Sequence, residues 1–180
     1  DINTLAKIYS GEINNWVDIG GPDLPIKLYS RDINSGTWDT FNKLVLRKNK
    51  RSLSLGTTLL ESSSALSSKV SQDDAAIGFI GLNYIKHNKA LSIAEGNNSI
   101  PICPTRFTIS TEDYALSRRL YFYTPTRAST EIKDFARFAI SKKGQKIVEE
   151  VGLLSQHIRV ETVYPVINGP SNITNMLGQL

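Results

Sequence analysis

Cysteine and histidine are scarce in this 180-residue chain, and their scarcity excludes several kinds of site. The single cysteine, Cys103, rules out an intrachain disulfide and any metal site built from several cysteines. We expect Cys103 to be a small packed residue. The two histidines, His87 and His157, lie far apart and lack a carboxylate or cysteine at ligand spacing, so we interpret them as surface or hydrogen-bonded residues. The sequence therefore predicts no metal site and no cofactor.

Long hydrophobic runs and a strong excess of charge are also missing. No apolar run approaches the roughly 20 residues that a bilayer-spanning helix needs. The chain starts at Asp1 without an initiator Met or a signal pattern, so we expect a processed or truncated piece of a longer protein. The net charge of +4 suits anionic ligands in general. Because aromatic residues do not alternate with the basic ones, we expect no nucleic-acid partner.

Short apolar segments alternate with segments of helical periodicity, which is typical of an α/β fold. We expect strands at 26–30, 75–80, 90–94 and 120–124, helices at 1–10, 37–47, 62–71, 130–140 and 145–151, and a loop at 52–60. The helix at 130–140 places Ile132, Phe135 and Phe138 on one face, which we expect to be buried.

The most informative segment runs from Ser30 to Thr37, between an expected strand and an expected helix. Ser35, Gly36 and Thr37 stand at the helix start, where backbone N–H groups, two hydroxyls and the positive end of the helix dipole suit an oxyanion. Arg31 can offer two parallel hydrogen bonds to phosphate or carboxylate. The alternative is an ordinary helix cap beside a solvated arginine. The loop is not a nucleotide P-loop, because it lacks the G-x-x-x-x-G-K-[ST] spacing.

Six stretches, in this order along the chain, resemble one family. They are 8–16 (Ile-Tyr-Ser-Gly-Glu-Ile-Asn-Asn-Trp), 20–26 (Gly-Gly-Pro-Asp-Leu-Pro-Ile), 31–41, 75–81 (Ala-Ala-Ile-Gly-Phe-Ile-Gly), 114–121 and 138–145. Together they are similar to the phosphate-binding subunits of bacterial phosphate ABC importers, which are type II periplasmic binding proteins. The resemblance covers roughly residues 1–155 and rests on several separate motifs.

This resemblance implies an α/β fold of the type II periplasmic-binding-protein kind, with one complete lobe plus part of the second. Residues 12–104 would form the second, central lobe with its anion loop. Residues 1–11 and 105–155 would form the crossover and part of the first lobe, whose opening half has no counterpart here. Residues 156–180 resemble a linker, which in some relatives leads to an OmpA-like domain. The strand at 120–124 would lack partners, which favours dimerisation of the chain.

The resemblance gives Arg31 the role of charged clamp on phosphate, with Ser35, Gly36 and Thr37 as hydrogen-bond donors. It implies a periplasmic solute-binding protein that captures inorganic phosphate for the membrane permease of an ABC transporter, without catalysis. One departure is Ile33, since many family members have an acid two positions before the serine. An acid there orients the arginine or accepts the phosphate proton, which sulfate lacks. With Ile33 in this place, the acceptor must come from the missing lobe or from Asp32, so Ile33 bears on selectivity.

Two other functions compete with solute capture. One is an envelope or structural module that keeps the fold but binds anions weakly or not at all; Ile33 and the linker-like tail favour it. The other is an enzyme, with Ser35 or Thr37 as nucleophile and a histidine as base. The sequence disfavours an enzyme, because it contains no G-x-S-x-G elbow and no recognisable third group to orient the base.

Overall fold

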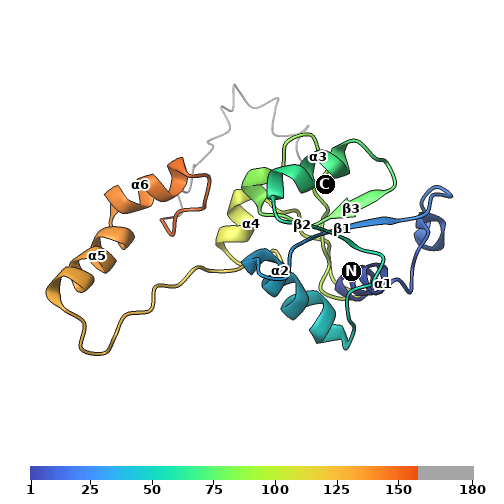
Figure 1. The fold of residues 1–180 in the computed structure, drawn as a ribbon. Coiled ribbons are helices and arrows are strands. Elements are labelled where there is room, and N and C mark those ends of the chain that lie inside the picture. Colours follow the sequence, from blue (N-terminus) through green and yellow to red (C-terminus); the bar gives the residue numbers. More distant parts are fainter. Residues whose placement is uncertain (158–180) are drawn as a thin grey trace, which may run out of the picture.

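The computed structural model describes residues 1–157, and its centre is a three-stranded parallel sheet (Figure 1). Strand β1 (Lys27–Arg31) lies between β2 (Thr58–Leu60) and β3 (Ala76–Gly78). Tyr29 is opposite Thr58 on one side and Gly78 on the other. Because the strands are parallel, their carboxyl ends meet at one edge of the sheet. The prediction of an α/β fold is confirmed, whereas the prediction that 52–60 is only a loop is wrong.

Helices connect the three strands and also precede and follow them in the chain. They are α1 (Ile2–Ser10), η1 (Trp16–Ile19), α2 (Gly36–Phe41) with its π-helical and 3-10 continuations η2 (Asn42–Leu46) and η3 (Arg47–Asn49), α3 (Ser63–Ser71), η4 (Leu82–Tyr84), α4 (Arg106–Ser110), α5 (Thr130–Ile140) and α6 (Lys142–Glu150). The expected helices at 1–10, 62–71 and 130–140 are confirmed. Among the described residues, no helix has both the length and the apolar character that crossing a membrane requires.

Helix α1 shows how local sequence sets an element. The Asp1 carboxylate accepts a hydrogen bond from the backbone N–H of Thr4 at 2.7 Å and caps the first turn. Gly11 ends the helix in the left-handed conformation, with φ of 84°, which glycine adopts without steric cost. The buried face of α1 includes Leu5, Ile8 and Tyr9.

Three aromatic rings join α1, α2 and the segment after β3. The Phe41 and Phe79 rings are stacked with centroids 3.9 Å apart, and Tyr9 meets Phe41 edge-on at 4.7 Å. Burial raises the pKa of Tyr9 above its ordinary value. Val45 and Leu46 of η2 are fully buried in the same core, against α1. This core therefore fixes α2, and with it the loop that precedes α2.

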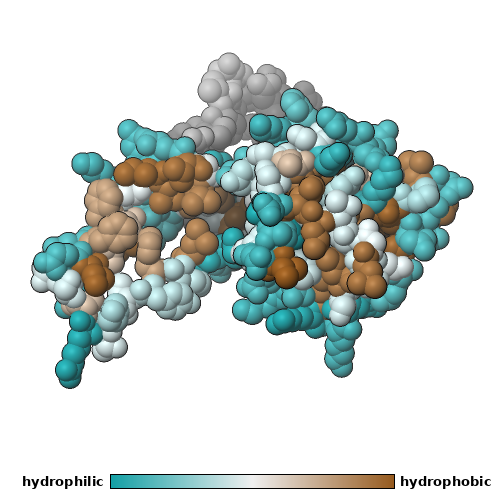
Figure 2. All heavy atoms as spheres, in the orientation of Figure 1, coloured by the Kyte–Doolittle hydropathy of each residue, from teal (hydrophilic) through white to brown (hydrophobic). Residues whose placement is uncertain are grey.

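The segment from 120 to 153 differs from the sequence expectation. Helices α5 and α6 pack on each other and stand away from the sheet, at the end of an extended connection (Figure 1). The prediction that one face of α5 is buried is wrong, because Phe135 is 60% exposed and Ile132 and Phe138 are also exposed. The expected strand at 120–124 is wrong too. No described strand lies beside it to supply the hydrogen bonds that a strand requires. Figure 2 shows apolar side chains gathered over this part of the surface.

Two smaller expectations also fail around residues 90–103. The expected strand at 90–94 is reduced to one antiparallel bridge between Ile93 and Ile102. Cys103 is exposed, and its Sγ lies 2.8 Å from the Ser92 Oγ. Cys103 is exposed because successive side chains of extended backbone point to opposite faces. Ser92 and Cys103 therefore point away from the face on which Ile93 is buried. His87 and His157 are both exposed, as expected.

We predict that Leu46→Ala lowers the free energy of unfolding by about 2–5 kcal/mol, because it opens a cavity in a fully buried position. Leu55→Ala is the matched control, since the Leu55 side chain is fully exposed and should change the free energy by less than about 0.5 kcal/mol. Urea unfolding of both variants measures the difference. Similar losses in the two variants would contradict the assignment of the core.

Candidate functional site

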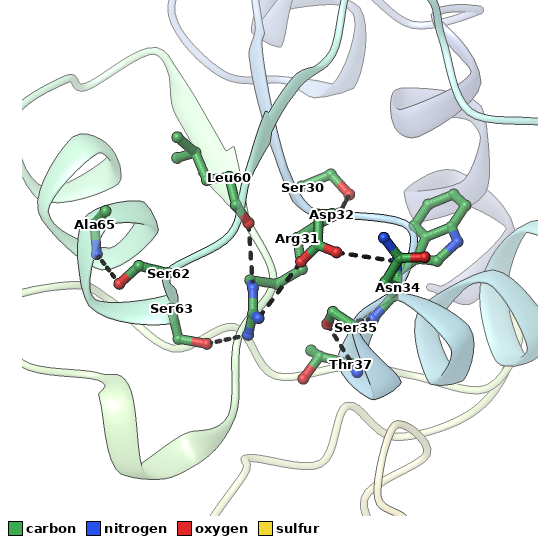
Figure 3. Close-up of polar contacts among 11 residues, drawn as sticks. Ser30, Arg31, Asp32, Asn34, Ser35, Thr37, Leu60, Ser62, Ser63 and Ala65 are labelled. Atoms are coloured by element: carbon green, nitrogen blue, oxygen red, sulfur yellow. Dashed lines mark hydrogen bonds and ion pairs between the residues drawn. The ribbon is translucent and has the colours of Figure 1, made fainter.

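The candidate site lies where β1 ends and α2 begins (Figure 3). Arg31 is the last residue of β1, and Ser35 is the N-cap of α2. The carboxyl edge of a parallel sheet is the usual place for ligands in open α/β folds, because loops and helix N-termini meet there. Helix α3 begins at the same edge, just after β2. The structure thus brings two helix starts beside one arginine.

The Arg31 guanidinium is held by neighbours from two other elements. Its Nε donates to the backbone oxygen of Leu60 at the end of β2, at 3.2 Å, and its Nη1 donates to the Ser63 hydroxyl on α3. The Asp32 carboxylate lies 3.7 Å from its Nη2. Only 17% of the Arg31 side chain is exposed. The guanidinium is therefore pre-oriented at the sheet edge, unlike a solvated surface arginine.

The turn from Asp32 to Ser35 is closed by its own hydrogen bonds. The Asp32 backbone oxygen accepts from the Ser35 N–H at 3.1 Å, and its carboxylate accepts from the Asn34 N–H at 3.0 Å. The Ser35 hydroxyl oxygen accepts from the backbone N–H groups of Thr37 and Trp38, at 3.1 and 3.2 Å. Ser35 is thus a helix cap, but its hydroxyl proton can still be donated to a ligand.

Gly36 and Thr37 supply further donors. Within the described residues, neither the Gly36 N–H nor the Thr37 hydroxyl has a hydrogen-bond partner. Gly36 is exposed and Thr37 is half-buried. All four residues singled out from the sequence therefore lie at one edge of the sheet, with Arg31 beside the start of α2. Ile33 lies within the same turn and is 64% exposed.

Two residues of the site were missed from the sequence. Ser63 belongs to a serine run that predicted only a helix start, and its place beside Arg31 depends on β2, which was taken for a loop. Arg118 donates from Nη1 to the Gly36 backbone oxygen at 2.9 Å, although it lies 82 positions further along the chain. No local signal in the sequence could have placed either side chain there.

The arrangement suits the binding of an oxyanion better than catalysis. It combines one oriented guanidinium, two hydroxyls and, among the described residues, the unpartnered N–H of Gly36 at a helix start. Neither Ser35 nor Thr37 is hydrogen-bonded to a histidine within residues 1–157, and the His157 ring contacts the Ile140 backbone oxygen instead. The same residues contain no group of three or more histidine, cysteine or acidic side chains placed to hold a metal ion.

The fold and the site define an α/β module with an arginine and a capped helix start at the carboxyl edge of its sheet. Comparison with known proteins identifies the family: residues 1–143 match the model of the PBP superfamily domain, and the chain belongs to this family. The structural relatives are type II periplasmic binding proteins, so the expected fold class is confirmed.

Individual relatives are named for phosphate. The phosphate-binding protein PstS of Borreliella burgdorferi is 34% identical over an alignment of 158 positions, which covers 83% of this chain and 56% of that protein. An ABC-type phosphate transport receptor from Vibrio cholerae has a TM-score of 0.68 at 27% identity, over 84% of this chain and 61% of that structure. A phosphate ABC transporter substrate-binding protein from Clostridium perfringens, solved with bound phosphate, has a TM-score of 0.63 at 27% identity. The match covers 86% of this chain and 61% of that structure. The chain thus spans little more than half the length of these relatives.

We predict that Ser35→Ala lowers the free energy of unfolding by about 1 kcal/mol, because two backbone N–H groups lose their acceptor. Ser71→Ala is the control, since the Ser71 hydroxyl only donates to a backbone oxygen at the exposed end of α3 and should change little. Urea unfolding compares the two variants. Equal effects would contradict the capping geometry.

Proposed function

We propose that this chain captures inorganic phosphate without catalysis, with Arg31, Ser35, Gly36 and Thr37 as the phosphate-binding residues. The observation that carries the proposal is the guanidinium of Arg31, which is fixed by Leu60 and Ser63 beside the first turn of α2. A planar guanidinium next to backbone and hydroxyl donors matches the geometry of a tetrahedral oxyanion. The phosphate-related names of the relatives support phosphate over other oxyanions.

We further propose that phosphate is delivered to the membrane permease of an ABC transporter, and that this takes place in the periplasm. The support is the kind of protein named among the relatives, which are phosphate transport receptors and substrate-binding proteins. Such proteins bind and release a solute, so no reaction needs to occur at the loop. A nucleic-acid partner is no part of this proposal.

The domain division remains a proposal as well. Residues 12–104 would form the central lobe, and 1–11 and 105–155 the crossover and part of another lobe. Helix α1 packs into the same core as η2, so it stays attached to the central lobe whatever its role in the crossover. Most of the linker-like stretch at 156–180 lies outside the described residues, which end at His157.

Ile33 favours one alternative function. This exposed residue lies within the loop, at a position where a carboxylate would accept a phosphate proton and isoleucine does not. Its presence favours an envelope module with weak or lost anion binding. The exposed aromatic run at 121–123 is compatible with dimerisation in either case. Titration of the wild-type chain separates the two functions, since an envelope module would bind both phosphate and sulfate weakly or not at all.

We predict that Arg31→Ala weakens phosphate binding by about 2–5 kcal/mol, because it removes a partly buried charge that faces the anion. Calorimetric titration at low ionic strength measures the change. Arg47→Ala is the matched control, since Arg47 is exposed in η3 at the far end of the helix and should leave the affinity unaltered. Unchanged affinity in Arg31→Ala would remove Arg31 from the site.

We predict that Ile33→Asp raises the ratio of phosphate to sulfate affinity by about tenfold or more, because the carboxylate accepts the phosphate proton and repels aprotic sulfate. Ile33→Asn is the control of similar shape, since its neutral amide accommodates both anions. Competition titrations near neutral pH give the ratio. The same ratio in both variants would mean that position 33 does not face the anion.

A further inference from the structure

Arg118 links the anion loop to the connection that leads out of the sheet unit. Just before it, Tyr114, Ala115 and Leu116 pack against the core. Just after it, the exposed Tyr121, Phe122 and Tyr123 begin the extended path to α5 (Figure 1). Arg118 is thus the point at which the chain leaves the core, and its guanidinium turns back to the Gly36 backbone oxygen at 2.9 Å.

The contact depends on the glycine at position 36. A Cβ built on Gly36 would lie 2.9 Å from the Arg118 Nη1 and 3.5 Å from its Nη2, so any larger side chain displaces the guanidinium. Gly36 does not need glycine for its backbone conformation, because its φ lies outside the left-handed region. The heavy atoms nearest to such a Cβ all belong to this guanidinium, so a side chain at position 36 would act first on Arg118.

The contact also fixes the direction of a peptide group in the loop. The Gly36 oxygen and the Thr37 N–H belong to one planar peptide unit. Arg118 and the Thr40 hydroxyl donate to the oxygen, at 2.9 Å each, while the N–H donates to the Ser35 hydroxyl oxygen at 3.1 Å. The first turn of α2 is therefore held from both sides, and one of the groups that hold it comes from the connection.

We propose that Arg118 is a positioning residue for the anion loop, and that it couples occupancy of the loop to the exposed connection at 117–127. This inference rests on the proposed function, because it assumes that the loop holds phosphate. Coupling between two sites is reciprocal: if the Arg118 contact favours bound phosphate, bound phosphate must favour the contact. Phosphate should then restrain the connection at a distance from the site.

The first test compares Arg118→Gln with Arg119→Gln. Both variants lose one positive charge from adjacent positions, but Arg119 pairs with Glu112 instead of contacting the loop. We expect Arg118→Gln to weaken phosphate binding about fivefold, with little change in the free energy of unfolding, and Arg119→Gln to leave the affinity within twofold of wild type. Arg118→Lys should restore part of the affinity, since a lysine keeps a charged donor near the Gly36 oxygen.

Gly36→Ala gives an independent way to break the same contact. Alanine is favoured over glycine in a helix, so this variant should remain folded. If Gly36→Ala lowers the phosphate affinity only by displacing Arg118, adding Arg118→Gln should cause no further loss. The double variant should then bind phosphate as tightly as the weaker-binding of the two single variants. Fully additive losses would contradict the proposal.

The second test follows the connection itself, by chymotrypsin cleavage at the exposed Tyr121, Phe122 and Tyr123. In the anion-free chain, Arg118→Gln should be cut faster than Arg119→Gln. Phosphate should slow cleavage of the wild type and of Arg119→Gln, and have a smaller effect on Arg118→Gln. Equal cleavage of the two variants without anion would overturn the proposal. A wild type that binds no phosphate would instead overturn the proposed function, and the anion-free comparison would still decide whether Arg118 holds the connection.

Discussion

The pairing of β1 with β2 is the constraint on which the candidate site depends. It sets Arg31 opposite Leu60, so that the guanidinium can donate to the Leu60 oxygen and reach Ser63 at the start of α3. A slip of one residue would turn Arg31 to the other face of the sheet. The arginine at the end of one strand is therefore oriented by the end of the next, and the turn to α2 starts from a fixed position.

The aromatic core supplies the second half of this arrangement. Phe41, stacked on Phe79 and in contact with Tyr9, holds the end of α2 against α1 and the segment after β3. With β1 fixed at one end and α2 at the other, the turn at 32–35 has little freedom, and its own hydrogen bonds complete it. A loop fixed in this way is pre-organised, and such a loop loses less entropy on binding a ligand than a mobile one does.

Local signals in the sequence predicted what local interactions determine. The strand, turn and helix around Arg31 follow from an apolar run, a serine cap and helical periodicity, and Gly11 correctly ended α1. Strand β2 was missed because three residues have no usable periodicity and exist as a strand only through pairing with β1. The opposite error occurred at 120–124. The strongly apolar composition predicted a strand there, but no described strand lies beside this segment to pair with it. Arg118 and Ser63 reach the loop through tertiary packing, which spacing along the chain does not encode.

The most direct test of the central claim is residue-resolved: amide chemical shifts of the ¹⁵N-labelled chain during titration with inorganic phosphate. If the loop after β1 holds the anion, the largest shifts will fall on the amides of Gly36 and Thr37, and Arg31→Ala will abolish them. A separate pocket is lined by residues that include Gly11, Asn14 and Gly56. Shifts centred there, or no saturable shifts at the loop, would contradict the account.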